Sequence, residues 1–289
     1  MPEELSQFSF AVALATLATA VGLYVLSIVG NRGLQAVGAS GGMALLRPAD
    51  HGPRAAAGRY ATLLTTNAFV FLSAALVARA VATGHGPFAN MFEFSLAFSW
   101  GAVALFLYFE FRYQMRTLAL FVLPVALGLL VYATTVPRDI EPLVPALQNN
   151  LLLSTHVAVA VLAYGAFTVA FAAAVLYLIQ HHDRIRWLPP RAKLDEIGYR
   201  AVLVGFPMLA LVIILGAVWA EIAWGTYWSW DPKETASLAT WLIYGGYLHA
   251  RVMRGWRGQR SALLLIGGFG ATLLTYYGNL FFGGMHSYA

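Results

Sequence analysis

The residues of this chain best suited to chemistry lie in one short aromatic segment. Residues 224-231 contain three tryptophans and one tyrosine, namely Trp224, Trp228, Trp230 and Tyr227. A hydrophobic stretch follows and carries Trp241 and His249. Flat aromatic faces suit a large planar ligand, and neutral imidazole is a common ligand of iron. The residue types therefore favour haem as the ligand of this region.

The composition indicates that membrane-spanning helices position these residues. The chain is 60% hydrophobic and 11% charged, and its mean hydropathy is +0.68. Apolar stretches of about 20 residues, the length that crosses a bilayer, predict eight transmembrane helices. Their ranges are 9-30, 60-82, 94-111, 117-136, 154-180, 200-220, 235-253 and 261-282. We expect an all-α, polytopic membrane helix bundle in which residues 1-289 form a single domain.

The basic residues predict the orientation of these helices. All but three of the 18 Lys and Arg residues fall in one set of alternate loops, and the exceptions are Arg79, Arg138 and Lys233. Lys and Arg concentrate on the cytoplasmic side of membrane proteins. Both termini are then expected on the outer face, with segment 221-235 forming an external tryptophan-rich loop. The acidic residues Glu3 and Glu4 before the first span argue against a cleaved signal peptide.

The predicted topology separates the histidines by depth. His156 opens the fifth span and His286 follows the eighth, so both lie on the same face as the tryptophan-rich segment. Two such histidines could converge as a bis-imidazole haem site over Trp224, Trp228 and Trp230. His249 follows Pro232 by 17 residues, which places it about 26 Å deeper at 1.5 Å per residue. It is therefore expected near the inner boundary of the membrane.

Simpler interpretations of these residues stay open. The tryptophans and terminal histidines could form an interfacial aromatic belt, although belt residues are normally scattered among helices. His249 could instead hydrogen-bond a neighbouring carbonyl near a helix end. As an iron ligand it has no histidine partner at its own depth in this chain. A second ligand would come from another subunit, from the loop histidines His51, His181 or His182, or be absent.

Two acidic motifs have both structural and functional interpretations. Asp231, Pro232 and Glu234 have the spacing of a helix N-cap, a first-turn proline and a capping box. Lys233 or the helix N-terminus could alternatively position haem propionates. Glu93, at the outer start of the third span, is either a functional intramembrane carboxylate or a capping residue.

Several function classes have no support in the sequence. Basic loops facing an anionic leaflet explain the net charge of +5 without nucleic-acid binding. Neither a phosphate-binding Gly-x-x-x-x-Gly-Lys-Ser/Thr run nor a His-Glu-x-x-His zinc motif is present. The chain contains no cysteine, so it cannot form disulfides or attach haem covalently to itself. Any thiol chemistry must come from a partner.

The motifs resemble the CcsA (ResC) family of cytochrome c biogenesis proteins, within the haem-handling superfamily that has a tryptophan-rich WWD signature. The resemblance is nearly gapless from about residue 194 to 289. It rests on the segments 224-234, 241-244, 247-249 and 285-289, with weaker agreement at 90-95 and 155-157. It implies an inner (cytoplasmic) membrane protein, or a thylakoid equivalent, that moves haem b to the outer face for cytochrome c maturation.

The resemblance also implies partners and site residues. A CcsB (ResB)-like membrane protein would complete a holocytochrome c synthase that joins haem vinyl groups to the Cys-x-x-Cys-His thiols of apocytochrome c. Thiol-reducing thioredoxin-like proteins are further expected partners. His156 and His286 would ligate an external haem, and His249 an intramembrane haem. The implied cofactor-binding residues are Trp224, Trp228, Trp230, Asp231 and Trp241. The chain has no CcsB-like region of its own.

Three alternative functions predict different observations. A haem permease or chaperone would use the same residues without forming thioether bonds. A b-type electron-transfer subunit would need paired histidines within the bundle and redox turnover with quinol. A membrane scaffold without a ligand would leave the aromatic segment unexplained.

Overall fold

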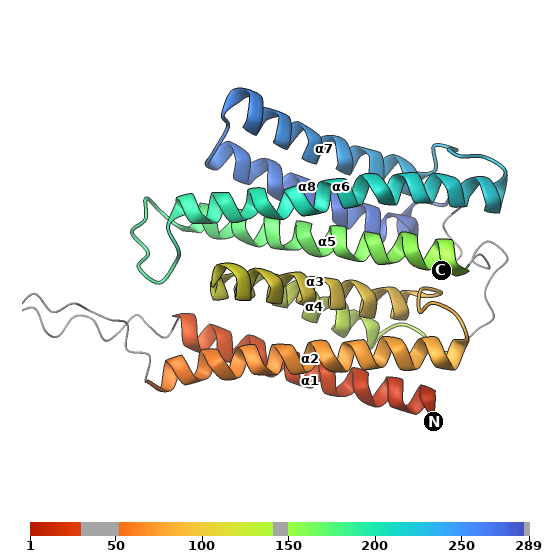
Figure 1. Cartoon of the computed structure of the whole chain (residues 1–289), viewed down its shortest axis with the longest axis horizontal. Helices are drawn as coiled ribbons and strands as arrows, with labels where there is room; N and C mark the ends of the chain where they lie inside the picture. Colours follow the sequence, from red (N-terminus) through yellow and green to blue (C-terminus); the bar gives the residue numbers. More distant parts are fainter. Residues whose placement is uncertain (30–51, 141–149, 286–289) are drawn as a thin grey trace, which may run out of the picture.

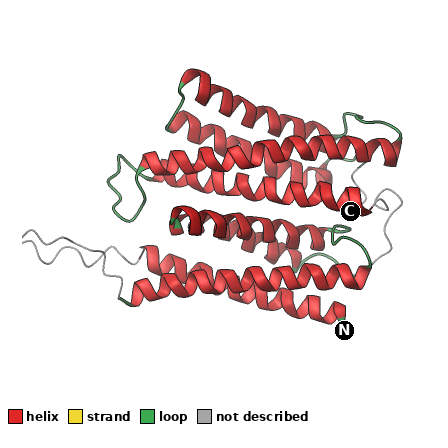
Figure 2. Cartoon of the chain, viewed as in Figure 1, coloured by secondary structure: helices red, strands yellow, loops and turns green. Residues whose placement is uncertain are grey.

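The computed structural model describes residues 1-29, 52-140 and 150-285, and in these ranges the chain forms α-helices and no strand (Figure 2). The first four helices are α1 (Pro2–Val29), α2 (Pro53–Thr83), α3 (Met91–Tyr113) and α4 (Ala119–Ala133), the last preceded by a 3-10 turn, η2 (Arg116–Leu118). The other four are α5 (Asn150–Ile179), α6 (Arg191–Trp224), α7 (Pro232–Arg254) and α8 (Gln259–Phe281). The all-α prediction is confirmed.

The helices run up and down in neighbouring antiparallel pairs, α1 with α2, α3 with α4, α5 with α6, and α7 with α8 (Figure 1). Contacts of α2 with α3 and of α1 with α4, together with those of α5 with α3 and with α8, join the pairs into one bundle. α1 begins and α8 ends at the same end of the bundle, and the α6–α7 loop also lies there (Figure 1). We call this the loop end, and the side of a membrane that it faces stays a prediction.

Seven helices in the described ranges are long and apolar enough to cross a membrane. Each of these overlaps a predicted span. α7 also overlaps its predicted span, 235-253, and at 23 residues it is long enough, but it is less apolar than the others. Its lower hydropathy comes from polar residues, which include Thr235, Ser237, Thr240 and His249.

α3 and α5 form the centre of the bundle. In their most apolar windows 78% of α3 and 72% of α5 is buried inside the protein, against 28% for α1 and for α6. Glycine permits the close approach of the two central helices. A Cβ atom added to Gly165 would lie 2.6 Å from the carbonyl oxygen of Gly101, so neither position has room for a side chain. This crossing fixes α5 relative to α3.

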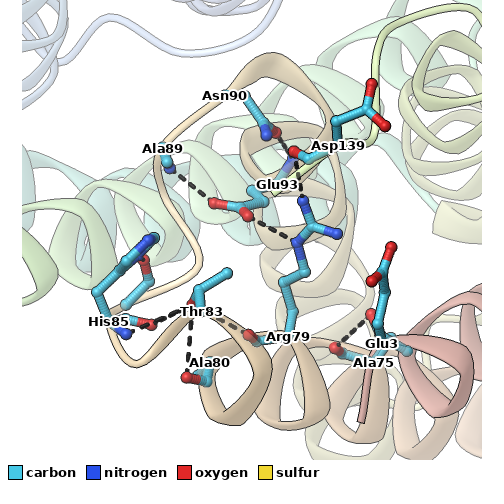
Figure 3. Close-up of polar contacts among 12 residues, drawn as sticks. Glu3, Ala75, Arg79, Ala80, Thr83, His85, Ala89, Asn90, Glu93 and Asp139 are labelled. Atoms are coloured by element: carbon cyan, nitrogen blue, oxygen red, sulfur yellow. Dashed lines mark hydrogen bonds and ion pairs between the residues drawn. The ribbon is translucent and has the colours of Figure 1, made fainter. Parts of the chain in front are cut away.

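A buried ion pair fixes the first turn of α3 at the loop end (Figure 3). Nε of Arg79, on α2, donates to Oε1 of Glu93 over 2.7 Å, and both side chains are 1% exposed. Nη2 of Arg79 also donates to the carbonyl oxygen of Asp139, over 3.1 Å. Asn90 is the N-cap of α3, and Oε2 of Glu93 accepts the backbone N–H of Ala89. Glu93 therefore both caps α3 and ties it to α2.

A second ion pair fixes α7 against α6 at the opposite end. Nη1 of Arg251 lies 2.8 Å from Oδ2 of Asp195, and Oδ1 of Asp195 accepts the backbone N–H of Gly258 over 3.0 Å. The Arg251 guanidinium also lies over the ring of Tyr199, 4.4 Å from its centroid. These contacts bury Arg251 and thereby set the rotation of α7.

Candidate functional site

The tryptophan-rich segment is a short loop held at both ends by helix termini. α6 ends at Trp224 with Gly225 in the left-handed region, at a φ of +75°, and α7 begins at Pro232. The helices thus extend into both ends of the expected loop 221-235. Trp230 also has a positive φ, of +60°. A non-glycine residue rarely adopts this conformation, so the surrounding contacts must hold it.

The predicted capping box at the start of α7 is confirmed. Oδ1 of Asp231 accepts the backbone N–H of Lys233 over 2.9 Å. Oε2 of Glu234 accepts the backbone N–H groups of Ser229 and Asp231, over 2.8 and 3.2 Å. Both carboxylates therefore bind backbone groups of the loop and of the first turn of α7.

Asp231 has a second role that the sequence did not indicate. Its Oδ2 accepts the backbone N–H of Met285 over 2.7 Å, and the Asp231 side chain is buried. A carboxylate that accepts two backbone N–H groups makes charge-assisted hydrogen bonds, which are stronger than neutral ones. Asp231 consequently joins the α6–α7 loop to the segment that follows α8.

A cavity lies beneath this loop, between α3, α5, α6, α7 and α8, with about 1040 Å³ of space not filled by protein atoms, counted out to its open mouth. The aromatic residues of its wall are Phe94, Phe98, Tyr164, Trp219, Tyr227, Trp228 and Tyr276. The cavity is mostly apolar, with a few polar groups, and it has the character of a site for a flat hydrophobic ligand.

His156 of α5 lines this cavity and packs against a glycine of α6. A Cβ atom added to Gly216 would lie 2.9 Å from Cε1 of His156 and 3.4 Å from its Nδ1. Any side chain larger than hydrogen at position 216 would therefore displace the imidazole. The pair places one imidazole, of the type that ligates iron, on the wall of an aromatic cavity.

The tryptophans divide into those that line the cavity and those that do not. Trp228 lines it, and so does Trp219, which is 3% exposed. Trp224 lies behind, edge-on to Trp219 with the ring centroids 4.7 Å apart. Trp230 makes an edge contact with Trp228 and is 70% exposed, so its ring faces outward.

Lys233 brings a positive charge to the same cavity. It is half-buried in the first turn of α7, ahead of the predicted span, and its Nζ lies 5.8 Å from the centroid of the Phe94 ring. Burial lowers the pKa of the Lys233 ammonium below its ordinary value, while the charge of Asp231 acts in the opposite direction. The ammonium is thus partly removed from water.

Comparison with known proteins identifies the family. A family model described as cytochrome C assembly protein matches residues 88–286, more than half of the chain. The cytochrome c biogenesis protein CcsA of Guillardia theta is 35% identical over 252 residues, which cover 78% of this chain and 83% of that protein. The chain belongs to the CcsA family of cytochrome c biogenesis proteins. The CcsA of Microcystis aeruginosa is 34% identical over 274 residues, which cover 75% of this chain and 83% of that protein.

The CcsA-family chain also resembles a solved structure. It superposes on the cytochrome c haem lyase CcmF with a TM-score of 0.72 and 19% sequence identity. The match covers 96% of this chain and 47% of that one, so the chain spans about half the length of CcmF. At this identity the likeness shows a shared fold. The bundle that surrounds the cavity is therefore an architecture common to both proteins.

Two further predicted site residues of this CcsA-family chain, Trp241 and His249, do not line the cavity. Trp241 stacks on Phe206 of α6, with centroids 5.1 Å apart, and packs against the main core. His249 is exposed on the outer surface of α7. His181 and His182 are exposed in the α5–α6 loop, where their Nδ1 atoms are 3.1 Å apart. His286 and His51 lie outside the described residues.

Several residues of the cavity wall were not predicted as site residues. Phe94 and Phe98 are four residues apart on α3, while Tyr164 lies two turns beyond His156 on α5. Residues four or eight apart share one face of a helix, so this spacing could have indicated a common wall. No sequence pattern indicated that Gly216 would contact His156, because this contact depends on how α6 packs on α5.

Proposed function

We propose that this protein binds haem b in the cavity beneath the α6–α7 loop and presents it on the outer face of the membrane for cytochrome c maturation. The observation that carries the proposal is the imidazole of His156 on the wall of an aromatic cavity, in contact with Gly216. The family supports a role in cytochrome c biogenesis and haem handling. We place the loop end on the outer side because the basic loops lie at the other end.

In this proposal the residues of the cavity hold the haem by three kinds of contact. The aromatic wall buries the porphyrin faces, and Trp228 closes the cavity on the loop side. His156 supplies one axial ligand to the iron. His286 supplies the second axial ligand. Its preceding residue, Met285, is held at the α6–α7 loop by the hydrogen bond from its backbone N–H to Asp231. Two imidazoles protect the iron until the histidine of the apocytochrome replaces one of them.

We further propose that attachment takes place in a complex with a CcsB (ResB)-like membrane protein. Thioether formation adds the S–H of an apocytochrome cysteine across the vinyl double bond: a C–S bond forms, and the thiol proton ends on the other vinyl carbon. The protein contributes mainly by positioning the reacting groups. Thioredoxin-like proteins keep the apocytochrome thiols reduced. This chain contains no cysteine, so no resident thiol competes for the vinyl groups.

A second haem site is favoured by the position of His249. This histidine is exposed on α7, and the space around the neighbouring Gly246 is open, because no heavy atom lies within 4 Å of a Cβ added there. An imidazole on the outside of the bundle can be reached by a helix of another protein. We propose that His249 is one axial ligand of an inner haem whose other ligand belongs to the CcsB-like partner.

The absorption spectrum of the detergent-purified protein, reduced and oxidised, tests the outer site. Replacement of His156 by alanine is expected to abolish or shift its low-spin haem bands. His85→Ala is the matched control, since His85 is also at the loop end but bonds the carbonyl of Gly86 and does not line the cavity. Equal haem content and equal spectra for the wild-type protein and His156→Ala would reject His156 as a ligand.

Two further measurements separate attachment from the alternative functions. The purified complex, given a Cys-x-x-Cys-His peptide, should yield a thioether product, whereas a permease or chaperone would deliver haem without it. A b-type electron-transfer subunit should instead turn over with quinol. Such a subunit needs paired histidines within the bundle, and in the described part of the bundle His156 lines the cavity whereas His249 is exposed on α7.

A further inference from the structure

The positive charge of Lys233 faces the cavity without a direct ion pair in the described part of the chain, and the nearby charge of Asp231 acts on it from a longer distance. Among the described residues that line the cavity, Lys233 is the only lysine or arginine. Its two acidic neighbours bind elsewhere, since Asp231 accepts N–H groups of Lys233 and Met285, and Glu234 accepts those of Ser229 and Asp231. In the described ranges no carboxylate oxygen lies within 4.0 Å of the Lys233 ammonium.

The surroundings of Lys233 favour an anionic partner from outside the chain. Its Nζ lies 5.8 Å from the centroid of the Phe94 ring, near the outer limit for a cation–π contact. A half-buried cation loses part of its hydration and is stabilised by an opposite charge. Since the ammonium and the His156 imidazole line the same cavity, one ligand can reach both.

We propose that the Lys233 ammonium binds a propionate carboxylate of the haem and thereby determines which edge of the porphyrin faces α7. The inference rests on the proposed haem site and assigns the orientation within it. Haem b carries its propionates on one edge and its two vinyl groups away from that edge. Anchoring a propionate at the first turn of α7 therefore turns the vinyl groups away from α7. Lys233 acts in this scheme as a positioning and specificity residue.

The test compares haem with its dimethyl ester, in which both propionates are esterified. The full chain, purified in detergent, is titrated with each compound and followed by absorbance. Lys233→Met keeps an unbranched side chain and the backbone N–H that Asp231 binds, but it removes the charge. We expect it to weaken haem binding about tenfold to a hundredfold, the range for a lost charged hydrogen bond, and to leave ester binding unchanged. Lys233→Arg should keep most of the preference for haem.

Lys193→Met is the matched control, because Lys193 is exposed at the start of α6, at the opposite end of the bundle. It should change neither titration. Equal loss of haem and ester binding in Lys233→Met, or no loss of either, would overturn the carboxylate contact while leaving the haem site standing. If neither compound gives a His156-dependent spectrum in the wild-type protein, the haem site itself is wrong and this inference fails with it.

Discussion

Replacing Gly216 by alanine tests the geometry that carries the proposed function. The new methyl carbon would lie 2.9 Å from Cε1 of His156. Carbon atoms in favourable contact are about 3.5 to 4.0 Å apart, so the ring must move by about 0.6 Å or more. The imidazole is the end of a flexible side chain, and a change of its rotamer relieves the overlap. The substitution therefore moves the ring more than it disturbs the helices.

The expected effects on stability and on haem binding differ in size. Alanine favours a helix over glycine by about 1 kcal/mol, which offsets part of an overpacking cost of about 1 to 3 kcal/mol. The net change in unfolding free energy should therefore be small. Metal–ligand distances tolerate only about 0.2 Å, and a misplacement of about 1 Å can cost a hundredfold in function. We expect haem affinity to fall about tenfold to a hundredfold.

Haem titration and thermal unfolding of the same detergent-purified samples measure the two effects. Gly128→Ala in α4 is the control, because a Cβ added there meets no heavy atom within 4 Å. It should leave haem affinity at its wild-type value and raise the unfolding free energy by about 1 kcal/mol. The prediction would be refuted if Gly216→Ala kept the wild-type haem affinity and spectrum while His156→Ala still lost the haem bands. The contact with Gly216 would then not position the imidazole.

Three other substitutions give further expected results. Asp231→Ala removes the N-cap of α7 and should lower the unfolding free energy by about 0.5 to 2 kcal/mol, with haem lost at a lower temperature than in the wild type. Arg79→Met leaves the buried Glu93 without its cation, a change that costs about 3 to 5 kcal/mol; folded yield in detergent should fall, and adding Glu93→Gln should recover part of it. His249→Ala changes an exposed side chain, so folded yield and the outer haem spectrum should persist while any partner-dependent haem signal is lost.

Hydropathy was sufficient to find the helices but not their ends. α1 begins at Pro2 and α6 at Arg191, whereas the spans were expected from residues 9 and 200. An apolar window marks only the part of a helix that matches hydrocarbon. The first turns of α6 instead carry polar residues such as Asp195, which binds Arg251 of α7. The extra length of α6 is therefore encoded in tertiary contacts that hydropathy does not report.

The candidate site was predictable where topology alone decides it. His156 lies in the second turn of α5, at the end of the bundle that also carries the α6–α7 loop, so a site containing His156 and Trp228 followed from counting spans. The directions of Trp224 and Trp230 did not follow, because the loop between them bends through positive φ values at Gly225 and Trp230 and has no helical period. Binding of haem by Trp224, Trp230 and Trp241 stays a prediction.

α7 has a second surface, which points away from the bundle and has the composition expected of a contact with a protein partner. Its outward residues repeat at alternating intervals of three and four, which places them along one stripe, and they are Ala239, Leu242, Gly246, His249 and Met253. Such a seam is typical of helix–helix packing, with small residues allowing close approach. Since α7 has 23 residues but is not among the seven described helices that are apolar enough to cross a membrane, we expect the CcsB-like partner, rather than lipid, to cover this stripe.

Gly246→Leu tests this expectation without changing the bundle itself. A Cβ at position 246 meets nothing within 4 Å in the chain alone, so leucine should leave the folded yield and the outer haem spectrum unchanged. Against a closely packed partner helix the larger side chain would clash. We therefore expect co-purification with the CcsB-like protein to fall, and the His249-dependent haem signal with it. Undiminished co-purification would show that the partner binds another face, and His249 would then need a different second ligand.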